Sequence, residues 1–283
     1  MATALDQPTD KFPPPAAGSS GPDEQSSDVV QPRRSRRRKK TPAQIKPSRR
    51  LELRYTREGY ALILGVDEVG VASASGPVFA CALAMPMNTR QIKGVRDSKT
   101  LSAAERERLE PLIRRQAVRL GVGAASVTEI DRLNIYHATH LAMRRAIARA
   151  GAHDFVIVDG NRIRGFEEHA GPYRAMVDAD ALCYVVSCAS IVAKVARDGL
   201  MRRLAERYPG YGWEHNAGYP TPDHRRSLAE LGITPHHRRS FITVKRVEIG
   251  DQLTLGVMNE GDVEEPLIVV PVEAAGLVSV PAG

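Results

Sequence analysis

Two short apolar runs that end on acidic residues limit what this chain can fold into. Leu62–Val66 leads directly into Asp67 and Glu68, and Phe155–Val158 leads into Asp159. Continuous apolar runs of this length are typical of buried strands. In open α/β sheets, ligand sites gather at the carboxyl ends of such strands. The pattern therefore predicts a buried sheet that delivers carboxylates to one of its edges.

The rest of the middle of the chain mixes strand-like and helix-like segments. Further strands are predicted at Pro77–Met85 and Arg119–Ser126, and the first strand begins near Ala61. Ser102 with Glu105 predicts a capped helix start, because this spacing forms a capping box. Helices are predicted over Ser102–Gln116, Ile135–Ala150, Asp180–Tyr208 and Pro222–Leu231. This mixture indicates an α/β domain with a central sheet.

The two ends of the chain differ in composition from the middle. Residues 1–58 are rich in Pro, Ser, Gly and Gln, and Arg33–Arg50 holds ten basic residues and no acid. The net charge is +7, so the remaining residues together carry −3. Because such a segment buries too little apolar surface to offset its ordering entropy, we predict a disordered basic extension. It is either a solvated tail or an arm that binds phosphates in a salt-sensitive way.

The folded domain is predicted to span residues 59–245, and residues 246–283 form a tail or small appendage in which we predict no helix. No apolar run reaches the roughly 18 residues of a membrane span, and the N-terminus has no apolar signal core. We therefore expect a cytoplasmic protein without a membrane partner. Cys81, Cys183 and Cys188 lack metal-ligand spacing and indicate small core residues in a reducing compartment. No separate apolar stripe stands out, which favours a monomer.

Four acidic residues are candidate metal ligands: Asp67, Glu68, Asp159 and Asp180. Singly, each has a plainer explanation, because strand-end acids are often solvated and Asp180 could cap the following helix. Asp178, two positions earlier, competes with Asp180 as either cap or ligand. Neighbouring carboxylates repel one another, so a buried group of them needs cations. An oxygen-rich set without His or Cys suits Mg²⁺ or Mn²⁺. Two such ions about 4 Å apart would clamp the attacking and leaving oxygens of a phosphodiester.

Two further features bear on this site. Consecutive strand residues point to opposite faces, so Asp67 and Glu68 can share an ion only where the strand ends or bends. Gly70 could supply that bend. Lys194 and Arg197 lie near one face of the long predicted helix and fit a polyanionic substrate. The alternative is a solvated helix surface with Asp198 beside Arg197.

A series of short motifs runs through roughly residues 60–245. In order, they are Gly65–Gly70 with Gly76–Val78, Arg96–Lys99, Asn134–Thr139 with Ala142–Ala146, Val158–Gly160, Ala189–Val195 with Arg197 and Asp198, Tyr208 and Pro209, Gly218 and Tyr219, Thr221, and His237–Phe241. In number and order these motifs resemble those of bacterial ribonuclease HII, within the RNase H-like superfamily.

The resemblance implies a fold, an activity and a set of site residues. The fold would be an RNase H-like mixed β-sheet flanked by helices, with a small C-terminal helical part from about Tyr208. The activity would be endonucleolytic hydrolysis of the RNA strand of RNA–DNA hybrids or ribonucleotide-containing DNA, leaving 3′-hydroxyl and 5′-phosphate ends. Metal-binding, catalytic residues would be Asp67, Glu68, Asp159 and Asp180, with Mn²⁺ or Mg²⁺ as cofactor. Substrate-binding residues would be Gly70, Lys99, Lys194 and Tyr219.

Several residues near the implied substrate depart from the family pattern. Gly70-Val71-Ala72 stands where the family has Gly-Arg-Gly, which removes a guanidinium and adds a Cβ. Other departures are Ala179 for Gly, Leu182-Cys183 for Lys-Ser, and Ala217 for Lys. They leave a second hypothesis open, a catalytically weak or inactive hybrid-binding protein. A ribonuclease HIII-like enzyme ranks last, because residues 1–58 are too short and polar for a folded substrate-binding domain.

Overall fold

A mixed five-stranded sheet forms the centre of the fold in the computed structural model, which describes residues 46–248. The strands stand in the order β3-β2-β1-β4-β5. β1 pairs antiparallel with β2, and β2 with β3, whereas β1–β4 and β4–β5 are parallel. The strands are β1 (Ile63–Val69), β2 (Val78–Ala84), β3 (Arg119–Ala125), β4 (Phe155–Asp159) and β5 (Tyr173–Met176). The predicted mixed sheet is confirmed, although β5 was not foreseen.

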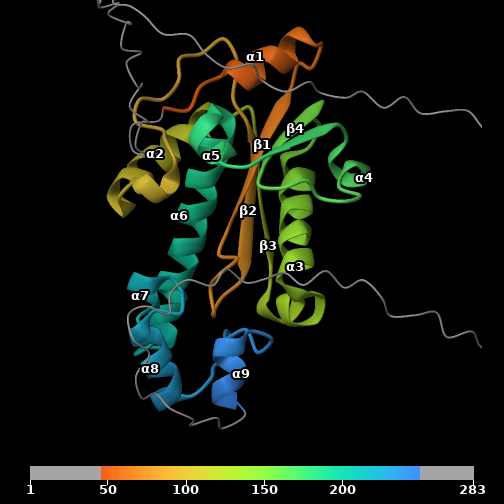
Figure 1. Ribbon diagram of the computed structural model, residues 1–283. Coiled ribbons are helices and arrows are strands. Elements are labelled where there is room, and N and C mark those ends of the chain that lie inside the picture. The colour runs from red at the N-terminus through yellow and green to blue at the C-terminus, as the bar shows by residue number, and fades with distance from the viewer. Residues whose placement is uncertain (1–45, 249–283) are drawn as a thin grey trace, which may run out of the picture. The chain divides into compact units, whose positions relative to one another are not determined.

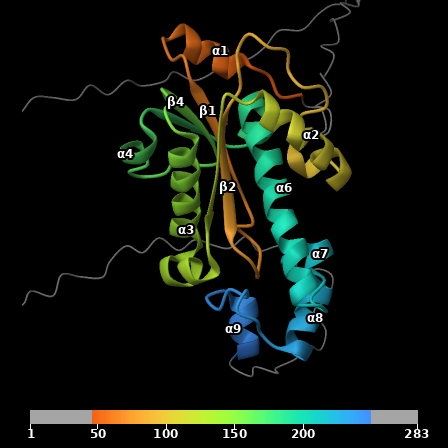
Figure 2. The ribbon, with the colours of Figure 1, turned by 180° about the vertical axis from the view of Figure 1, so that it is seen from behind.

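Helices cover both faces of this sheet. The long helices α3 and α6 lie on opposite faces, as the two ribbon views show (Figures 1 and 2). The helices are α1 (Arg50–Arg57), α2 (Ala103–Gln116), α3 (Val127–Ala150), α4 (Glu167–Ala170), α5 (Ala179–Leu182), α6 (Tyr184–Arg207), α7 (Trp213–Asn216), α8 (Pro222–Leu231) and α9 (Ile242–Glu248). Within residues 46–248, none combines the length and apolar character needed to cross a bilayer.

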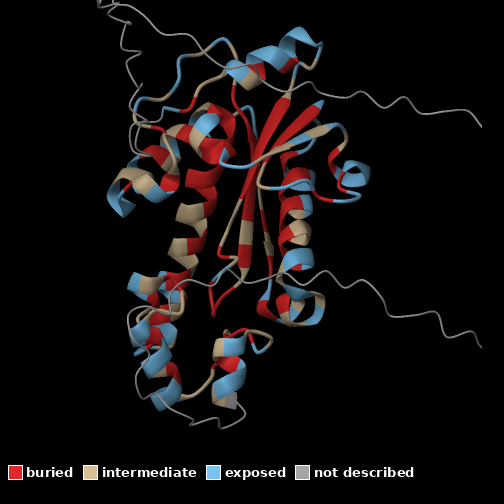
Figure 3. Cartoon of the chain, viewed as in Figure 1, coloured by how far each residue is buried: buried red, intermediate tan, exposed pale blue. Residues whose placement is uncertain are grey.

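Two separate apolar clusters fill the space between the sheet and the helices. Buried residues lie along the strands and on both of the long helices (Figure 3). On the α6 side, Ile63 and Ile157 of the sheet belong to one buried cluster with Val192. On the α3 side, Leu64 and Val158 belong to another. Alternate residues of β1 therefore serve different layers, as expected of a strand buried on both faces.

One glycine sets how closely α6 approaches the sheet. A Cβ at Gly65 would overlap the main chain of Val185. The backbones of β1 and α6 therefore meet directly at this level, which brings the start of α6 close to the strand that carries Asp67 and Glu68.

Local sequence signals explain where the two best-defined helices begin. Ser102 accepts from the Glu105 amide and closes the predicted capping box of α2. Ser126 and Glu129 form a second capping box, so α3 begins at Val127 rather than at the predicted Ile135. The chain is kinked at Asn134, where φ is 66°. That kink divides the helical pattern and explains why only its second part was predicted.

Three predictions about element boundaries were wrong. α1 lies inside the range predicted to be disordered, and α9 extends into the C-terminal part where no helix was expected. Short helices of this kind are stabilised by tertiary packing rather than by their own pattern. Tyr55 of α1 stacks on Phe155 with ring centres 4.0 Å apart, and Val244 of α9 is fully buried. The third error is the predicted helix Asp180–Tyr208, which is broken at Cys183 in extended conformation.

The remaining parts of the two predicted tails, residues 1–45 and 249–283, lie outside the described residues, and so does the run Arg33–Lys40 within the basic segment. The small C-terminal helical part is confirmed. It comprises α7, α8 and α9, which pack around Trp213, Leu228 and Val244 together with Met201 of α6.

Candidate metal centre

Three carboxylates from three different elements converge beside the sheet. Asp67 lies within β1, Asp159 ends β4, and Asp180 lies in α5. One oxygen from each is within 4.8 Å of the other two. The parallel pairing of Val66 with Val158 explains the first two, because the next residue of each strand is then an aspartate. Asp67 and Asp180 are 4% and 3% exposed, so this is a buried acidic group.

Hydrogen bonds fix α5 against this group. Asp159 accepts from the Ala179 amide at 2.7 Å, which joins the end of β4 to the first residue of α5. The Ser187 hydroxyl of α6 donates to the main-chain oxygen of Asp180. Neither Asp178 nor Asp180 caps a helix with its side chain, since Asp178 precedes α5 without such a bond and Asp180 lies within α5. The helix-cap alternative for Asp180 is therefore wrong.

Glu68 lies beside the three aspartates but is not one of the converging set. β1 continues to Val69, so there is no bend at Asp67 and Glu68 to turn both side chains the same way. The Glu68 amide donates to Asp67 at 2.8 Å, and one Glu68 carboxylate oxygen, Oε2, is buried without a hydrogen-bond partner. The structure thus gathers three of the four predicted acids and leaves the fourth adjacent.

The electrostatics of the group favour a bound cation. Burial raises the pKa of Asp67 well above its usual range, and repulsion from Glu68 and Asp159 adds to this. Burial followed by repulsion from Asp159 raises the pKa of Glu68 to about 7. The neighbouring Lys99 ammonium is 3.4 Å from Asp180 but its side chain is 80% exposed. An unpaired buried carboxylate oxygen beside three converging aspartates is a donor set that suits a hard divalent ion.

The metal-free protein is expected to gain stability from Glu68→Gln only as the pH rises. The folded pKa of about 7 exceeds the ordinary value of 4.5, so the cost of ionising Glu68 is absent below pH 4.5 and complete above pH 7. The melting temperature of Glu68→Gln, measured by calorimetry with a chelator present, should match wild type at pH 4.5 and exceed it most above pH 7. Glu230→Gln, an exposed change on α8, is the control. An equal difference at both pH values would contradict a charge effect.

The predicted substrate residue Gly70 follows β1 and is buried, with φ at +90°. A Cβ at this position would overlap the Arg197 guanidinium, so only glycine fits. Val71 is half-buried and packs against the core on the α3 side, whereas Ala72 is exposed. The φ of Ala72 is not positive. Alanine therefore fits the third position of this loop without backbone strain.

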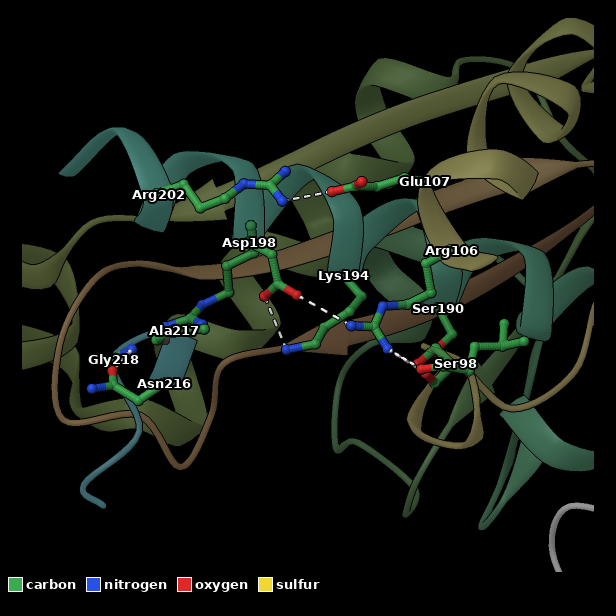
Figure 4. Close-up of polar contacts among 12 residues, drawn as sticks. Ser98, Arg106, Glu107, Ser190, Lys194, Asp198, Arg202, Asn216, Ala217 and Gly218 are labelled. Atoms are coloured by element: carbon green, nitrogen blue, oxygen red, sulfur yellow. Dashed lines mark hydrogen bonds and ion pairs between the residues drawn. The ribbon is translucent and has the colours of Figure 1, made fainter. Parts of the chain in front are cut away.

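The other three predicted substrate residues lie at two places. Lys99 lies beside the acidic residue Asp180, as described above, and Lys194 lies beside Tyr219. Lys194 lies with its ammonium 5.6 Å from the ring centre of Tyr219. Asp198 holds this ammonium at 2.9 Å and also faces Arg106, at 3.7 Å, as the close-up shows (Figure 4). Tyr219 and Lys194 are thus brought together by α6 and the C-terminal helical part.

The predicted surface position of Arg197 is wrong. The residue is fully buried rather than on a helix surface. Its guanidinium donates to the main-chain carbonyls of Ser75, Pro77 and Ala217 at 2.8–3.0 Å. Arg197 is therefore part of the scaffold and not a direct partner for a polyanion.

Arg238 is a second scaffold residue, and the sequence analysis does not predict this role. It too is fully buried, and it donates to the carbonyls of Gly70, Val71 and Gly76 at 2.7–2.9 Å. Burial lowers its pKa to about 9. Together Arg197 and Arg238 form the arginine clamp, which holds five carbonyls of residues 70–77 and one of Ala217. The sequence signals only that both arginines fall within motifs, not that they are buried.

The comparisons with known proteins agree with this geometry. The sequence model of the family "Ribonuclease HII" matches residues 64–244. The chain belongs to the ribonuclease HII family. Ribonuclease HII of Thermosynechococcus vestitus is 46% identical over 194 residues, which cover 68% of this chain and 88% of that protein. Ribonuclease HII of Granulibacter bethesdensis is 49% identical over 206 residues, covering 71% and 91%.

Solved structures of related proteins have a similar fold. The crystal structure of ribonuclease H2 from Pyrococcus horikoshii OT3 matches with a TM-score of 0.60 at 24% identity, covering 68% of this chain and 99% of that one. The predicted RNase H-like architecture is thereby confirmed. As a ribonuclease HII, the protein is a ribonuclease H, an endonuclease of the hydrolase class.

Proposed function

We propose that this ribonuclease HII hydrolyses the RNA strand of RNA–DNA hybrids and of ribonucleotide-containing DNA, with Mn²⁺ or Mg²⁺ held by Asp67, Asp159 and Asp180. The observation that carries the proposal is the convergence of these three carboxylates within 4.8 Å. Glu68 would complete the metal-binding, catalytic set, and its unpaired oxygen supports this role. A divalent ion bound there supplies Lewis acidity toward a phosphate oxygen and an attacking water.

The surrounding side chains would bind and orient the nucleic acid. Tyr219 offers a ring on which a sugar or base can pack, and Lys194 places a positive charge over the same ring at 5.6 Å. Lys99, exposed beside Asp180, would face a phosphate near the acids. Gly70 would set the path of the loop that approaches the substrate backbone. We further infer a monomer acting in the cytoplasm, and the three buried, free cysteines fit a reducing compartment.

The competing proposal is a hybrid-binding protein of weak or absent activity, which the Val71 and Ala72 departures favour. Cleavage of a labelled long hybrid and of a duplex with one embedded ribonucleotide, with Mg²⁺ or Mn²⁺, separates the two. Metal-dependent products ending in 5′-phosphate support the nuclease. Binding without cleavage under either ion supports the alternative.

The substrate preference is expected to depend on Val71 and Ala72. Without a guanidinium in this loop, we expect weaker cleavage at a single ribonucleotide than in a long hybrid. Val71→Arg combined with Ala72→Gly should raise single-ribonucleotide cleavage relative to long-hybrid cleavage, as measured by the ratio of the two kcat/KM values. Val118→Arg, which adds the same charge at an exposed position between α2 and β3, is the control. A ratio near one in the wild type would contradict this prediction.

A further inference from the structure

The turn that carries Asp180 connects two helices through a single residue. Cys183 separates α5 from α6 and is the residue before the first turn of α6. Its own side chain forms no capping bond to that turn. A 24-residue helix therefore begins four residues after the proposed ligand Asp180 without a local side-chain cap. Helix starts leave backbone N–H groups that must find other partners.

A segment that precedes the matched family region supplies those partners. The Tyr184 amide donates to the Ser48 carbonyl at 3.2 Å, and the Ser48 amide donates to the Leu182 carbonyl at 3.0 Å. The Val185 amide donates to the Glu52 carboxylate at 3.1 Å. Glu52 of α1 is only 2% exposed. It thus caps α6 from a distant part of the chain, at the end of the sheet where α1 and α5 lie (Figure 1).

The position of α1 does not depend on Glu52 alone. Tyr55 stacks on Phe155, and the Arg49 guanidinium lies 4.9 Å from the ring centre of Tyr184. Arg49 also donates to the Pro86 carbonyl at 2.6 Å. These contacts anchor the segment on β4, on α6 and beyond the end of β2. We therefore expect α1 to stay docked when the carboxylate of Glu52 is altered.

We propose that Glu52 is a positioning residue for the acidic site: by capping α6 it fixes the turn between α5 and α6, and with it Asp180 opposite Asp67 and Asp159. The inference rests on the proposed role of Asp180 as a metal ligand. Partners that orient metal ligands from outside typically change metal affinity by roughly 10–100-fold when removed. Burial raises the pKa of Glu52 to about 7, so its acceptor role does not require full charge and a neutral amide oxygen should replace it.

The test is the affinity of the full-length protein for Mn²⁺. It is measured by titration, with the concentration of unbound Mn²⁺ read from its electron paramagnetic resonance signal. Glu52→Ala should weaken Mn²⁺ binding about tenfold, whereas Glu52→Gln should stay within about twofold of wild type because it keeps an acceptor oxygen. Glu58→Ala, an exposed change just after α1, is the matched control and should bind as wild type does. Asp180→Asn provides the reference for a damaged site.

Each outcome bears on the proposal. A lower melting temperature in Glu52→Ala with unchanged Mn²⁺ affinity overturns it and leaves Glu52 as a stabilising contact only. If the wild-type protein does not bind Mn²⁺, the proposed metal site is wrong and the inference fails with it. The same holds if Asp180→Asn binds Mn²⁺ as tightly as the wild-type protein does. If Glu52→Ala does not fold, Glu52→Asp shortens the side chain by one methylene. Loss of amide-exchange protection at Val185 in that variant, without weaker Mn²⁺ binding, also overturns the proposal.

Discussion

Asp67→Asn is expected to reduce hybrid cleavage strongly while raising the thermal stability of the metal-free protein. One oxygen of Asp67 lies within 4.8 Å of oxygens of both Asp159 and Asp180, so loss of its charge removes one of the three converging carboxylates of the proposed site. A direct ligand should matter more than the 10–100-fold typical of an outer partner, and we expect a loss of about 10³-fold in kcat/KM. The same change removes a buried charge whose pKa is raised by burial and by its acidic neighbours. Cleavage of a labelled hybrid and calorimetry in chelator measure the two effects.

Asp178→Asn is the matched control for this prediction. Asp178 is exposed two residues before Asp180, and its φ of 58° is one that asparagine adopts readily. It should leave both activity and stability nearly unchanged. Activity in Asp67→Asn within tenfold of wild type would contradict the metal role of Asp67. A lower melting temperature would contradict the repulsion that we infer within the acidic group.

The largest loss of folding stability is expected from Arg197→Met. Arg197 donates three hydrogen bonds to main-chain carbonyls, of which those of Ser75 and Ala217 are buried and that of Pro77 is partly buried, and methionine fills similar space without replacing any of them. Each unpaired buried carbonyl costs about 1 kcal/mol or more, so the free energy of unfolding should fall by roughly 3–5 kcal/mol. Because Gly70 packs directly on this guanidinium, the loop after β1 should also lose order. Urea unfolding and amide exchange at residues 70–77 measure these effects.

Arg202→Met on the same helix provides the control. Arg202 is an exposed arginine that pairs with Glu107 across to α2 (Figure 4). Exposed ion pairs contribute about 0–1 kcal/mol, so its loss should be small. If Arg197→Met and Arg202→Met lower the free energy of unfolding by similar amounts, the hydrogen bonds from Arg197 to the carbonyls do not stabilise the loop.

The central strands and their acids could be predicted because their signals are local. The runs before Asp67 and Asp159 are apolar on both faces, and such runs become buried strands. The break before α6 could not be predicted, because Cys183 disrupts the helix without proline or glycine. Its cap comes from Glu52, 133 residues away from Val185. No local pattern in the sequence indicates a contact between residues so far apart in the chain.

The candidate site could be predicted only in part, because some of its features also depend on contacts between distant residues. The aspartates stand at recognisable places, but the orientation of Glu68 depends on how far β1 continues. Arg197 was misplaced because arginine on an amphipathic helix usually faces solvent. Its burial is possible only because several main-chain carbonyls turn toward it, an arrangement that residue types alone do not reveal.

The arginine clamp also has a consequence for the order in which the protein matures during synthesis. Arg197 reaches back 120 residues to Pro77, and Arg238 reaches back 168 residues to Gly70. A nascent chain emerges N-terminal end first. The carbonyls of the loop beside Asp67 therefore bond water instead of these arginines until almost the whole folded domain has left the ribosome. The nuclease should thus stay inactive on the translating ribosome until Arg238 has emerged and can bind the carbonyls of this loop.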